Sequence, residues 1–129
     1  MNYLMFKLLI VDDEEEIRTG IRNIIDWNSH NIQVCGEASN GKQAIKLIDE
    51  LSPHIILVDI EMPIMSGLEL IDYLSINNPD VKSIILSGHD DFSYAQNAIK
   101  HGASDYLLKP CKSQEILQSV LKVADCIEK

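Results

Sequence analysis

Carboxylates follow two apolar segments of the chain, at the point where each segment ends. Asp59 follows the run 55–58, and Asp12 and Asp13 follow the run 7–11. Apolar runs of this length are typical of strands that are buried on both faces of a parallel sheet. Open α/β sheets bind ligands in the crevice beyond the C-terminal ends of their strands. These three carboxylates are therefore the first candidates for chemistry.

Two further polar side chains end the next two predicted strands. Ser87 follows the segment 82–86, and Lys109 follows the segment 106–108. A single polar residue at a strand end is more often a turn or cap residue, so neither is informative alone. Their occurrence together with the three carboxylates, all at strand ends, is a much more specific pattern.

The chemistry of this set is that of phosphoryl groups and magnesium. Clustered carboxylates repel one another, and Asp12, Asp13 and Asp59 would form a hard oxygen site suited to Mg²⁺. A carboxylate can also attack phosphorus and form an acyl phosphate. The cation of Lys109 and the hydroxyl of Ser87 are the kinds of group that stabilise the transferred phosphoryl oxygens.

Strand and helix patterns alternate along the chain and would position these residues. A further strand is predicted over Ile32–Ala38. Helices are predicted over about 14–25, from after the boundary 39–41 to about Leu51, and over about 66–75, 91–100 and 113–127. In the first helix, Ile17, Ile21, Ile24 and Ile25 are expected on the buried face. The alternation predicts an α/β fold, a five-stranded doubly wound parallel sheet with helices on both faces. Right-handed crossovers place all strand C-termini at one edge.

Composition and charge narrow the function classes. The chain of 129 residues suits one domain, and its formal net charge of −9 argues against nucleic-acid contacts by this segment. The three cysteines match no metal motif and indicate reduced thiols in a cytoplasmic protein. No stretch approaches the roughly 20 apolar residues that span a bilayer, so no membrane contact is expected.

Four motifs give the chain a resemblance to the receiver domain of two-component response regulators, from about Phe6 to Ile127. They are Leu8–Glu14 (LLIVDDE), Ile56–Gly67 (ILVDIEMPIMSG), Ile85–Gly88 (ILSG) and Gly102–Pro110 (GASDYLLKP). The resemblance implies a flavodoxin-like (βα)5 fold with strand order 2-1-3-4-5. It also implies that residues 1–129 are a single receiver domain, without its DNA-binding output domain.

The resemblance implies a role for each candidate residue. Asp59 would be the phosphoacceptor, and Asp12 and Asp13 would hold Mg²⁺ together with Asp59 and the backbone carbonyl of Glu61. Ser87 and Lys109 would bind the phosphoryl oxygens. Mg²⁺-dependent self-phosphorylation and autodephosphorylation would be weak, so the chain is not expected to be an enzyme in the ordinary sense.

Other positions match the family more loosely. Tyr106 stands where the family has an aromatic switch residue that turns inward on activation. Ser87 is the second residue expected to take part in the switch. His89 stands near the mouth of the crevice. In the family, the residue at that position influences the lifetime of the phosphoryl group, and the alternative for His89 is an ordinary loop residue without such a role. The Lys109–Pro110 bond should be cis. Trp27 is expected to serve packing.

A finer resemblance is to the receivers of AraC-type transcriptional regulators in Gram-positive bacteria. It is carried by the segments 25–27, 37–41 and 87–95, although the subgroup often has Tyr where His89 stands. The implied partners are a sensor histidine kinase and an attached DNA-binding output domain. Because Ser87 and Lys109 lie at the roots of the fourth helix, the fifth strand and the last helix, a homodimer through that face is expected.

Two alternatives come from other function classes. A phosphohydrolase of the haloacid-dehalogenase type also uses a strand-end aspartate and Mg²⁺, but it needs Asp two residues after the nucleophile, where this chain has Glu61. A protein-interaction domain that keeps the receiver fold without phosphorylation is the second alternative. The intact set of five polar residues argues against it.

Overall fold

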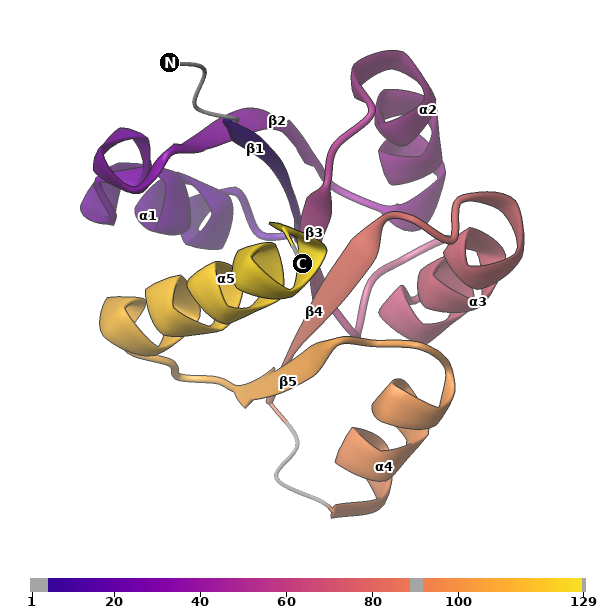
Figure 1. Ribbon diagram of the computed structural model, residues 1–129. Helices are drawn as coiled ribbons and strands as arrows, with labels where there is room; N and C mark the ends of the chain where they lie inside the picture. The colour runs from indigo at the N-terminus through magenta and orange to yellow at the C-terminus, as the bar shows by residue number, and fades with distance from the viewer. Residues whose placement is uncertain (1–4, 89–91, 129) are drawn as a thin grey trace.

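The apolar runs of the sequence form one five-stranded parallel sheet with the order β2-β1-β3-β4-β5. The computed structural model of the protein describes residues 5–88 and 92–128 (Figure 1). The strands are β1 Phe6–Val11, β2 Ile32–Ala38, β3 Ile55–Asp59, β4 Lys82–Ser87 and β5 Asp105–Leu108. This topology confirms the predicted flavodoxin-like fold.

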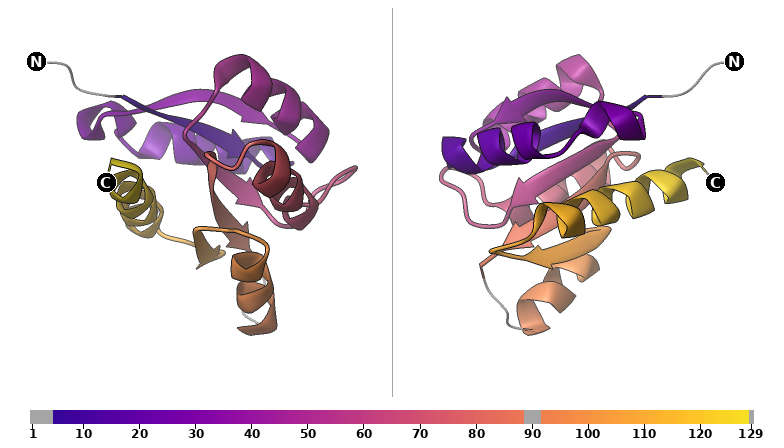
Figure 2. Two further views of the ribbon diagram at one scale, coloured as in Figure 1. Left: turned by 45° about the vertical axis from the view of Figure 1, so that its right-hand side comes forward. Right: turned by 90° about the vertical axis from the view of Figure 1, so that its left-hand side faces the viewer.

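Helices cover both faces of the sheet, with α1 and α5 on one side and α2, α3 and α4 on the other (Figure 2). Their bounds are α1 Glu15–Ile24, α2 Gly41–Leu51, α3 Gly67–Asn77, α4 Phe92–Lys100 and α5 Ser113–Glu128. A 3-10 helix, η1 Trp27–His30, follows α1 and was not expected. The expected start of the fourth helix near Asp91 lies outside the described residues.

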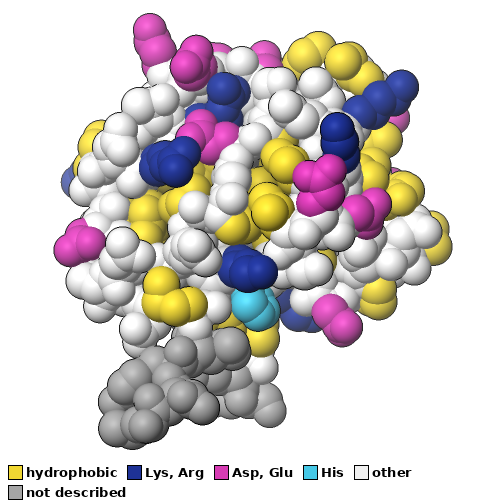
Figure 3. Space-filling model, turned by 90° about the horizontal axis from the view of Figure 1, so that it is seen from above, with side chains coloured by type: hydrophobic (Ala, Val, Ile, Leu, Met, Phe, Trp, Pro, Cys, Tyr) yellow, Lys and Arg dark blue, Asp and Glu magenta, His cyan; other side chains and the backbone are white. Residues whose placement is uncertain are grey.

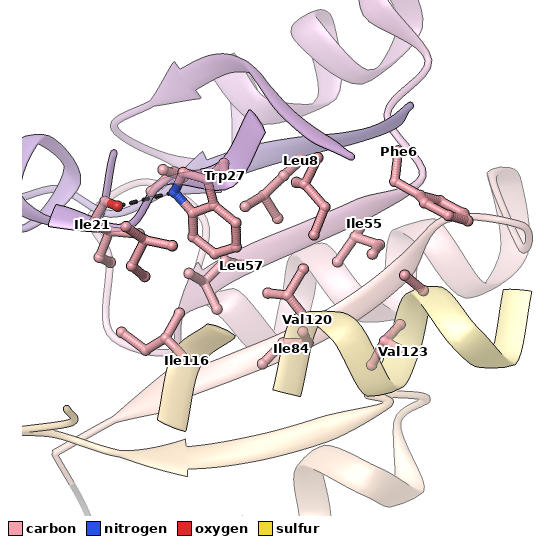
Figure 4. Close-up of a cluster of buried hydrophobic side chains, with 14 of the residues drawn as sticks. Phe6, Leu8, Ile21, Trp27, Ile55, Leu57, Ile84, Ile116, Val120 and Val123 are labelled. Atoms are coloured by element: carbon pink, nitrogen blue, oxygen red, sulfur yellow. Dashed lines mark hydrogen bonds between the residues drawn. The ribbon is translucent and has the colours of Figure 1, made fainter. Parts of the chain in front are cut away.

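The core on the α1 and α5 side contains the tryptophan (Figure 4). Trp27 is 4% exposed, and its Nε1–H donates to the carbonyl oxygen of Ile21 at 3.0 Å. It packs with alternate residues of β1, β3 and β4 and with Ile116 and Val120 of α5. The prediction that Trp27 serves packing is consistent with this burial.

One predicted core residue is wrong. Ile24 is 73% exposed, whereas Ile21 and Ile25 are buried. Helix α1 ends at Ile24, and Ile25 has an extended backbone with φ −98° and ψ 131°. The chain then turns through η1, and Trp27 is buried in the same core as Ile21 and Ile25.

Local hydrogen bonds explain where the helices begin. Ser66 and Glu69 form a capping box at α3, in which each side chain accepts from the other's backbone N–H. The side chain of Asn40 accepts from the N–H of Gln43 at 2.9 Å and caps α2. Both helices therefore begin just beyond strand ends, on the side where β1 and β3 deliver their carboxylates.

Candidate functional site

Three carboxylates meet at the C-terminal ends of β1 and β3. One oxygen each from Asp12, Asp13 and Asp59 lies within 4.8 Å of the others. The pairing of Val11 with Val58 in the parallel register brings Asp12 beside Asp59. Asp12 and Asp59 are 1% and 6% exposed, and Asp13 is open to solvent. The structure thus brings together the three carboxylates that the sequence places at strand ends.

Asp12 is fixed by both its backbone and its side chain. Its N–H donates to the carbonyl of Ala38 on β2 at 3.0 Å, which continues the β1–β2 ladder by one residue. One carboxylate oxygen, Oδ1, accepts from the N–H of Glu14 at 2.9 Å. The other oxygen, Oδ2, is turned towards Lys109. Asp12 is therefore a rigid part of the site.

Lys109 connects the carboxylates of two strands. Its Nζ lies 3.0 Å from Asp12 Oδ2 and 3.4 Å from Asp59 Oδ1. Its backbone N–H donates to the carbonyl of Ser87 at 2.7 Å, so the residue is tied to the end of β4. The Lys109–Pro110 peptide is cis, as expected.

A glycine allows the start of α3 to lie against Asp59. A Cβ on Gly67 would be 2.5 Å from the carbonyl oxygen of Asp59 and 2.8 Å from the Cα of Ile60, both of which are backbone atoms. The Gly67 N–H donates to the Ile60 carbonyl at 2.9 Å. The loop between β3 and α3 therefore returns to the strand end that carries Asp59.

The electrostatics of the site are those of crowded carboxylates with one cation. Burial raises the pKa of Asp59 to about 6, Lys109 works against that rise, and Asp12 adds to it. Burial alone would lower the pKa of Lys109, but its hydrogen bond to Asp12 and the charges of Asp12 and Asp59 raise it overall. Three carboxylates with one lysine leave negative charge in the crevice, which suits a hard divalent cation such as Mg²⁺.

Ser87 lies at the edge of this cluster. It is the last residue of β4 and is 0% exposed. Leu86 pairs with Asp59 in the β3–β4 register, so Ser87 stands one residue beyond the carboxylate on the adjacent strand. Glu61 is exposed two residues after Asp59, and its N–H lies 3.4 Å from Asp59 Oδ1.

The remaining candidates are less directly placed. Tyr106 is half-buried on β5, pairs with Ile85 and packs against the core on the α2, α3 and α4 side. Its predicted role as a switch stays a prediction. His89 lies outside the described residues. Cys111 is half-buried, and burial followed by the charge of Glu115 raises the pKa of its thiol, as suits a structural thiol.

Comparison with known proteins decides the family. The sequence model of the response regulator receiver domain matches residues 8–121, almost the whole chain. The chain belongs to the family of response regulator receiver domains. This membership decides against the haloacid-dehalogenase alternative.

Similar receivers occur in bacterial transcriptional regulators. The chain is 44% identical over 119 residues to YesN of Bacillus subtilis, an uncharacterized transcriptional regulatory protein, covering 92% of this chain and 32% of YesN. It is 39% identical over 120 residues to the chemotaxis protein CheY of Listeria monocytogenes, covering 93% of this chain and 99% of CheY. The chain thus spans about a third of the length of YesN.

Among solved structures, the receiver domain of AraT, a response regulator from Geobacillus stearothermophilus, is similar throughout. The TM-score is 0.88 at 43% identity, and the match covers 97% of each chain. Together with YesN, this receiver agrees with the predicted likeness to receivers of AraC-type regulators. Within the described residues, no helix is long and apolar enough to cross a membrane.

Two residues that bear on the site were missed by sequence reasoning. Gly67 was seen only as part of a motif, although its lack of a side chain is what lets α3 reach Asp59. Arg18 was not singled out, although its guanidinium Nη1 donates to the carbonyl oxygen of Asp12 at 2.5 Å. The sequence offers only an arginine six residues after Asp12, in the helix that follows it, and this spacing does not reveal the contact with the Asp12 carbonyl.

Proposed function

We propose that the receiver accepts a phosphoryl group on Asp59 from the phosphorylated histidine of a sensor kinase. The observation that carries the proposal is the position of Lys109 Nζ, 3.4 Å from an oxygen of Asp59 and 3.0 Å from Asp12. A cation placed against a strand-end carboxylate can bind the phosphoryl oxygens once that carboxylate has become an acyl phosphate.

In this reaction one carboxylate oxygen of Asp59 forms a bond to phosphorus. The bond between phosphorus and the histidine nitrogen of the kinase breaks, and the nitrogen keeps the electron pair. Lys109 then exchanges its contact with Asp59 for a phosphoryl oxygen, and the Ser87 hydroxyl donates to another. The roles of these two donors follow the general pattern in which positioned cations and hydroxyls stabilise a transferred phosphoryl group.

The metal for this chemistry is proposed to be Mg²⁺. The carboxylates of Asp12, Asp13 and Asp59 and the backbone carbonyl of Glu61 would hold it, and their all-oxygen donor set fits this ion. When bound, it would neutralise charge on the carboxylates and on the phosphoryl oxygens. Self-phosphorylation from small donors and autodephosphorylation are proposed to be slow, so the domain works as a switch rather than as an enzyme.

The biological setting is proposed from the relatives. Because YesN is named as a transcriptional regulatory protein, the receiver is proposed to control an attached DNA-binding output domain in the cytoplasm. Phosphorylation is proposed to promote a homodimer through α4, β5 and α5. The receiver segment itself is proposed to make no contact with nucleic acid, because its formal net charge is −9.

The proposal is tested by phosphorylating the purified domain with acetyl phosphate and Mg²⁺ and measuring the intact mass. A gain of about 80 Da per molecule is expected, the mass of one phosphoryl group on a carboxylate nucleophile. Asp59→Asn should abolish the gain, whereas Asp80→Asn, an exposed carboxylate in the turn before β4, should leave it unchanged. Labelling of Asp59→Asn at the wild-type level would show that another residue is the phosphoacceptor. No labelling of the wild type by donor or kinase would favour a domain that binds partners without phosphorylation.

A further inference from the structure

Arg18 reaches back from the first turns of α1 to the backbone of the site. Its Nη1 donates to the carbonyl oxygen of Asp12 at 2.5 Å. The side chain is only 15% exposed, which is unusual for an arginine. A half-buried guanidinium that contacts a backbone carbonyl next to a cluster of carboxylates calls for a physical reason.

Glu37 on β2 holds the arginine in this position. Its Oε1 accepts from Arg18 Nε at 3.1 Å, and its Oε2 accepts from Nη1 of Arg22 at 2.7 Å. The next residue of β2, Ala38, accepts the N–H of Asp12 at 3.0 Å. Two consecutive residues of β2 therefore fix both backbone polar groups of Asp12, one directly and one through Arg18.

Fixing the carbonyl of Asp12 also fixes the direction of Asp13. The carbonyl belongs to the peptide that joins these two residues, and a peptide is planar, so its orientation sets where the Asp13 Cα lies. Within the described part of the chain, no hydrogen bond or ion pair holds the Asp13 carboxylate, which is open to solvent. Its place in the cluster depends on the backbone before it.

We propose that Arg18, anchored by Glu37, is a positioning residue that aims the carboxylates of Asp12 and Asp13 at the divalent cation. The inference rests on the proposed Mg²⁺ site and adds to it a residue that does not touch the metal. Groups that orient metal ligands from outside are commonly needed for affinity even though they make no bond to the ion.

The charge of Arg18 makes the proposal sharply testable. A guanidinium beside a cation site repels the cation, so its removal would strengthen Mg²⁺ binding if charge alone mattered. If Arg18 positions the ligands, its removal must weaken binding in spite of that charge. The two explanations predict effects of opposite sign.

The experiment measures Mg²⁺ affinity by amide NMR titration of the unphosphorylated domain, which also shows whether each variant is folded. Arg18→Met keeps the apolar stem and removes the donor, and we expect the Kd for Mg²⁺ to rise roughly 10-fold. Arg22→Met removes the same charge from the same helix and the same partner, Glu37, but has no contact with Asp12. Its Kd should stay within about two-fold of the wild type. Arg18→Lys, which can donate to one carbonyl, should recover part of the loss.

The outcomes separate this inference from the proposed function. If the wild type shows no Mg²⁺ binding, the metal assignment itself is wrong, and the positioning role is overturned with it. If the wild type binds Mg²⁺ but folded Arg18→Met binds as tightly or more tightly, only the positioning role is overturned. The same holds if Arg22→Met loses as much affinity as Arg18→Met. Should Arg18→Met fail to fold, the shorter and uncharged Arg18→Gln decides: binding weaker than the wild type and weaker than Arg22→Met supports the proposal, and binding as tight as or tighter than the wild type overturns it.

Discussion

Asp59 illustrates how a candidate site residue can weaken the fold that carries it. Its folded pKa is about 6, above the ordinary value of 3.8, chiefly because the carboxyl group is buried. Between these values the folded chain binds more protons than the unfolded chain at this site. The contribution of Asp59 to stability should therefore be highest below the ordinary pKa, and it should be lost as pH rises from there through about 6.

Asp59→Asn should consequently stabilise the metal-free domain at neutral pH. The neutral amide removes a buried negative charge, and the gain should be on the order of 1–2 kcal/mol at about pH 7.5. The gain should shrink at about pH 5, where the wild-type carboxyl is mostly protonated. Urea unfolding of both proteins in chelator at the two pH values measures this. An equal difference in the free energy of unfolding between the two proteins at both pH values would mean that the charge of Asp59 does not destabilise the fold.

Ile64, in the loop after β3, has an unusual backbone conformation for its type. Its φ is +70° and its side chain is 68% exposed. A β-branched residue in the left-handed region is strained, and its exposed side chain gains little from packing. Ile64→Asn should therefore raise the free energy of unfolding by about 1 kcal/mol, because asparagine tolerates this conformation.

A second exposed isoleucine provides the control for Ile64. Ile76 lies on α3 and is 80% exposed, in ordinary helical structure. Ile76→Asn should be neutral or slightly destabilising, since asparagine is no better than isoleucine in a helix. Thermal unfolding of both variants tests the difference. A loss of stability at position 64 that matches the one at position 76 would show that backbone strain is not relieved there.

The candidate site divides into residues that the sequence could predict and residues that it could not. Asp12, Asp13 and Asp59 were predictable because a parallel sheet brings strand ends to one edge, whatever the detailed packing. Arg18 was not, since its contact with the Asp12 carbonyl depends on the orientation of α1 and on Glu37 of a different strand. Residue types at strand ends can be read from a sequence, whereas side-chain reach across elements cannot.

At the scale of elements, the junction between β3 and α3 depends on Gly67. A Cβ there would meet backbone atoms of Asp59 and Ile60 that have no room to move separately. Gly67→Ala should therefore displace the start of α3 and cost about 1–3 kcal/mol of stability, as overpacking does. It should also slow phosphorylation of the folded protein, because the displaced backbone carries Asp59.

Gly20 in α1 is the matched control for this junction. A Cβ on Gly20 would find its nearest neighbour, the Cδ1 of Ile24, at 3.9 Å, an ordinary contact. Gly20→Ala should stabilise the helix by up to about 1 kcal/mol. Chemical unfolding and the initial rate of mass gain with acetyl phosphate give both readouts. A Gly67→Ala variant that is as stable as the wild type and is phosphorylated at the same rate would show that the close contact of Gly67 with the Asp59 backbone is not required.

The elements themselves were largely predictable. Alternating apolar runs and helical periodicity predicted every strand and helix that the described residues contain, apart from η1. The Ile24 error arose because helical periodicity groups residues by face but does not say how far the covering core extends at the end of a helix, where Ile24 is the last residue. Trp27, three residues after the last residue of α1, belongs to the core on that side, and no local pattern encodes this tertiary contact.

At the scale of the whole molecule, the sheet separates two cores and gathers the candidate site residues at one edge. Charged side chains of both signs are interspersed over the face that carries β2 and α2 (Figure 3). No strong basic patch is visible on that face, in keeping with the formal net charge of −9. The route by which a change at the site could reach a partner depends on how the site is connected to the elements around it.

That connection runs from the site into β5 and α5. The Lys109 N–H is bonded to the Ser87 carbonyl, and Lys109 immediately follows β5. Asp105 at the start of β5 accepts from Ser119 Oγ on α5 at 2.6 Å and pairs with Lys122 at 3.2 Å. A movement of Lys109 can thus displace β5 and α5 together, because these two elements are joined by the contacts of Asp105.

We expect phosphorylation to promote a homodimer through the face built from α4, β5 and α5. Ile99 on α4 and Leu108 on β5 are 51% and 45% exposed and offer apolar surface there. Sedimentation velocity with Mg²⁺ and beryllofluoride, a phosphoryl mimic, should show dimers that are absent without the mimic. Because a ligand shifts an equilibrium only by binding its two states unequally, the mimic must bind the dimer-competent state more tightly.

A pair of charge substitutions tests whether the dimer interface lies on the face built from α4, β5 and α5. Ile99→Glu puts a carboxylate into the expected contact and should prevent dimer formation with the mimic, since an unpaired charge is costly to bury. Ile76→Glu introduces the same charge at an exposed position of α3, away from that face, and should leave dimerisation unchanged. Identical sedimentation of the wild type with and without the mimic, over a wide concentration range, would exclude phosphorylation-driven dimerisation of the isolated receiver. Loss of the dimer in Ile76→Glu alone would move the interface to α3.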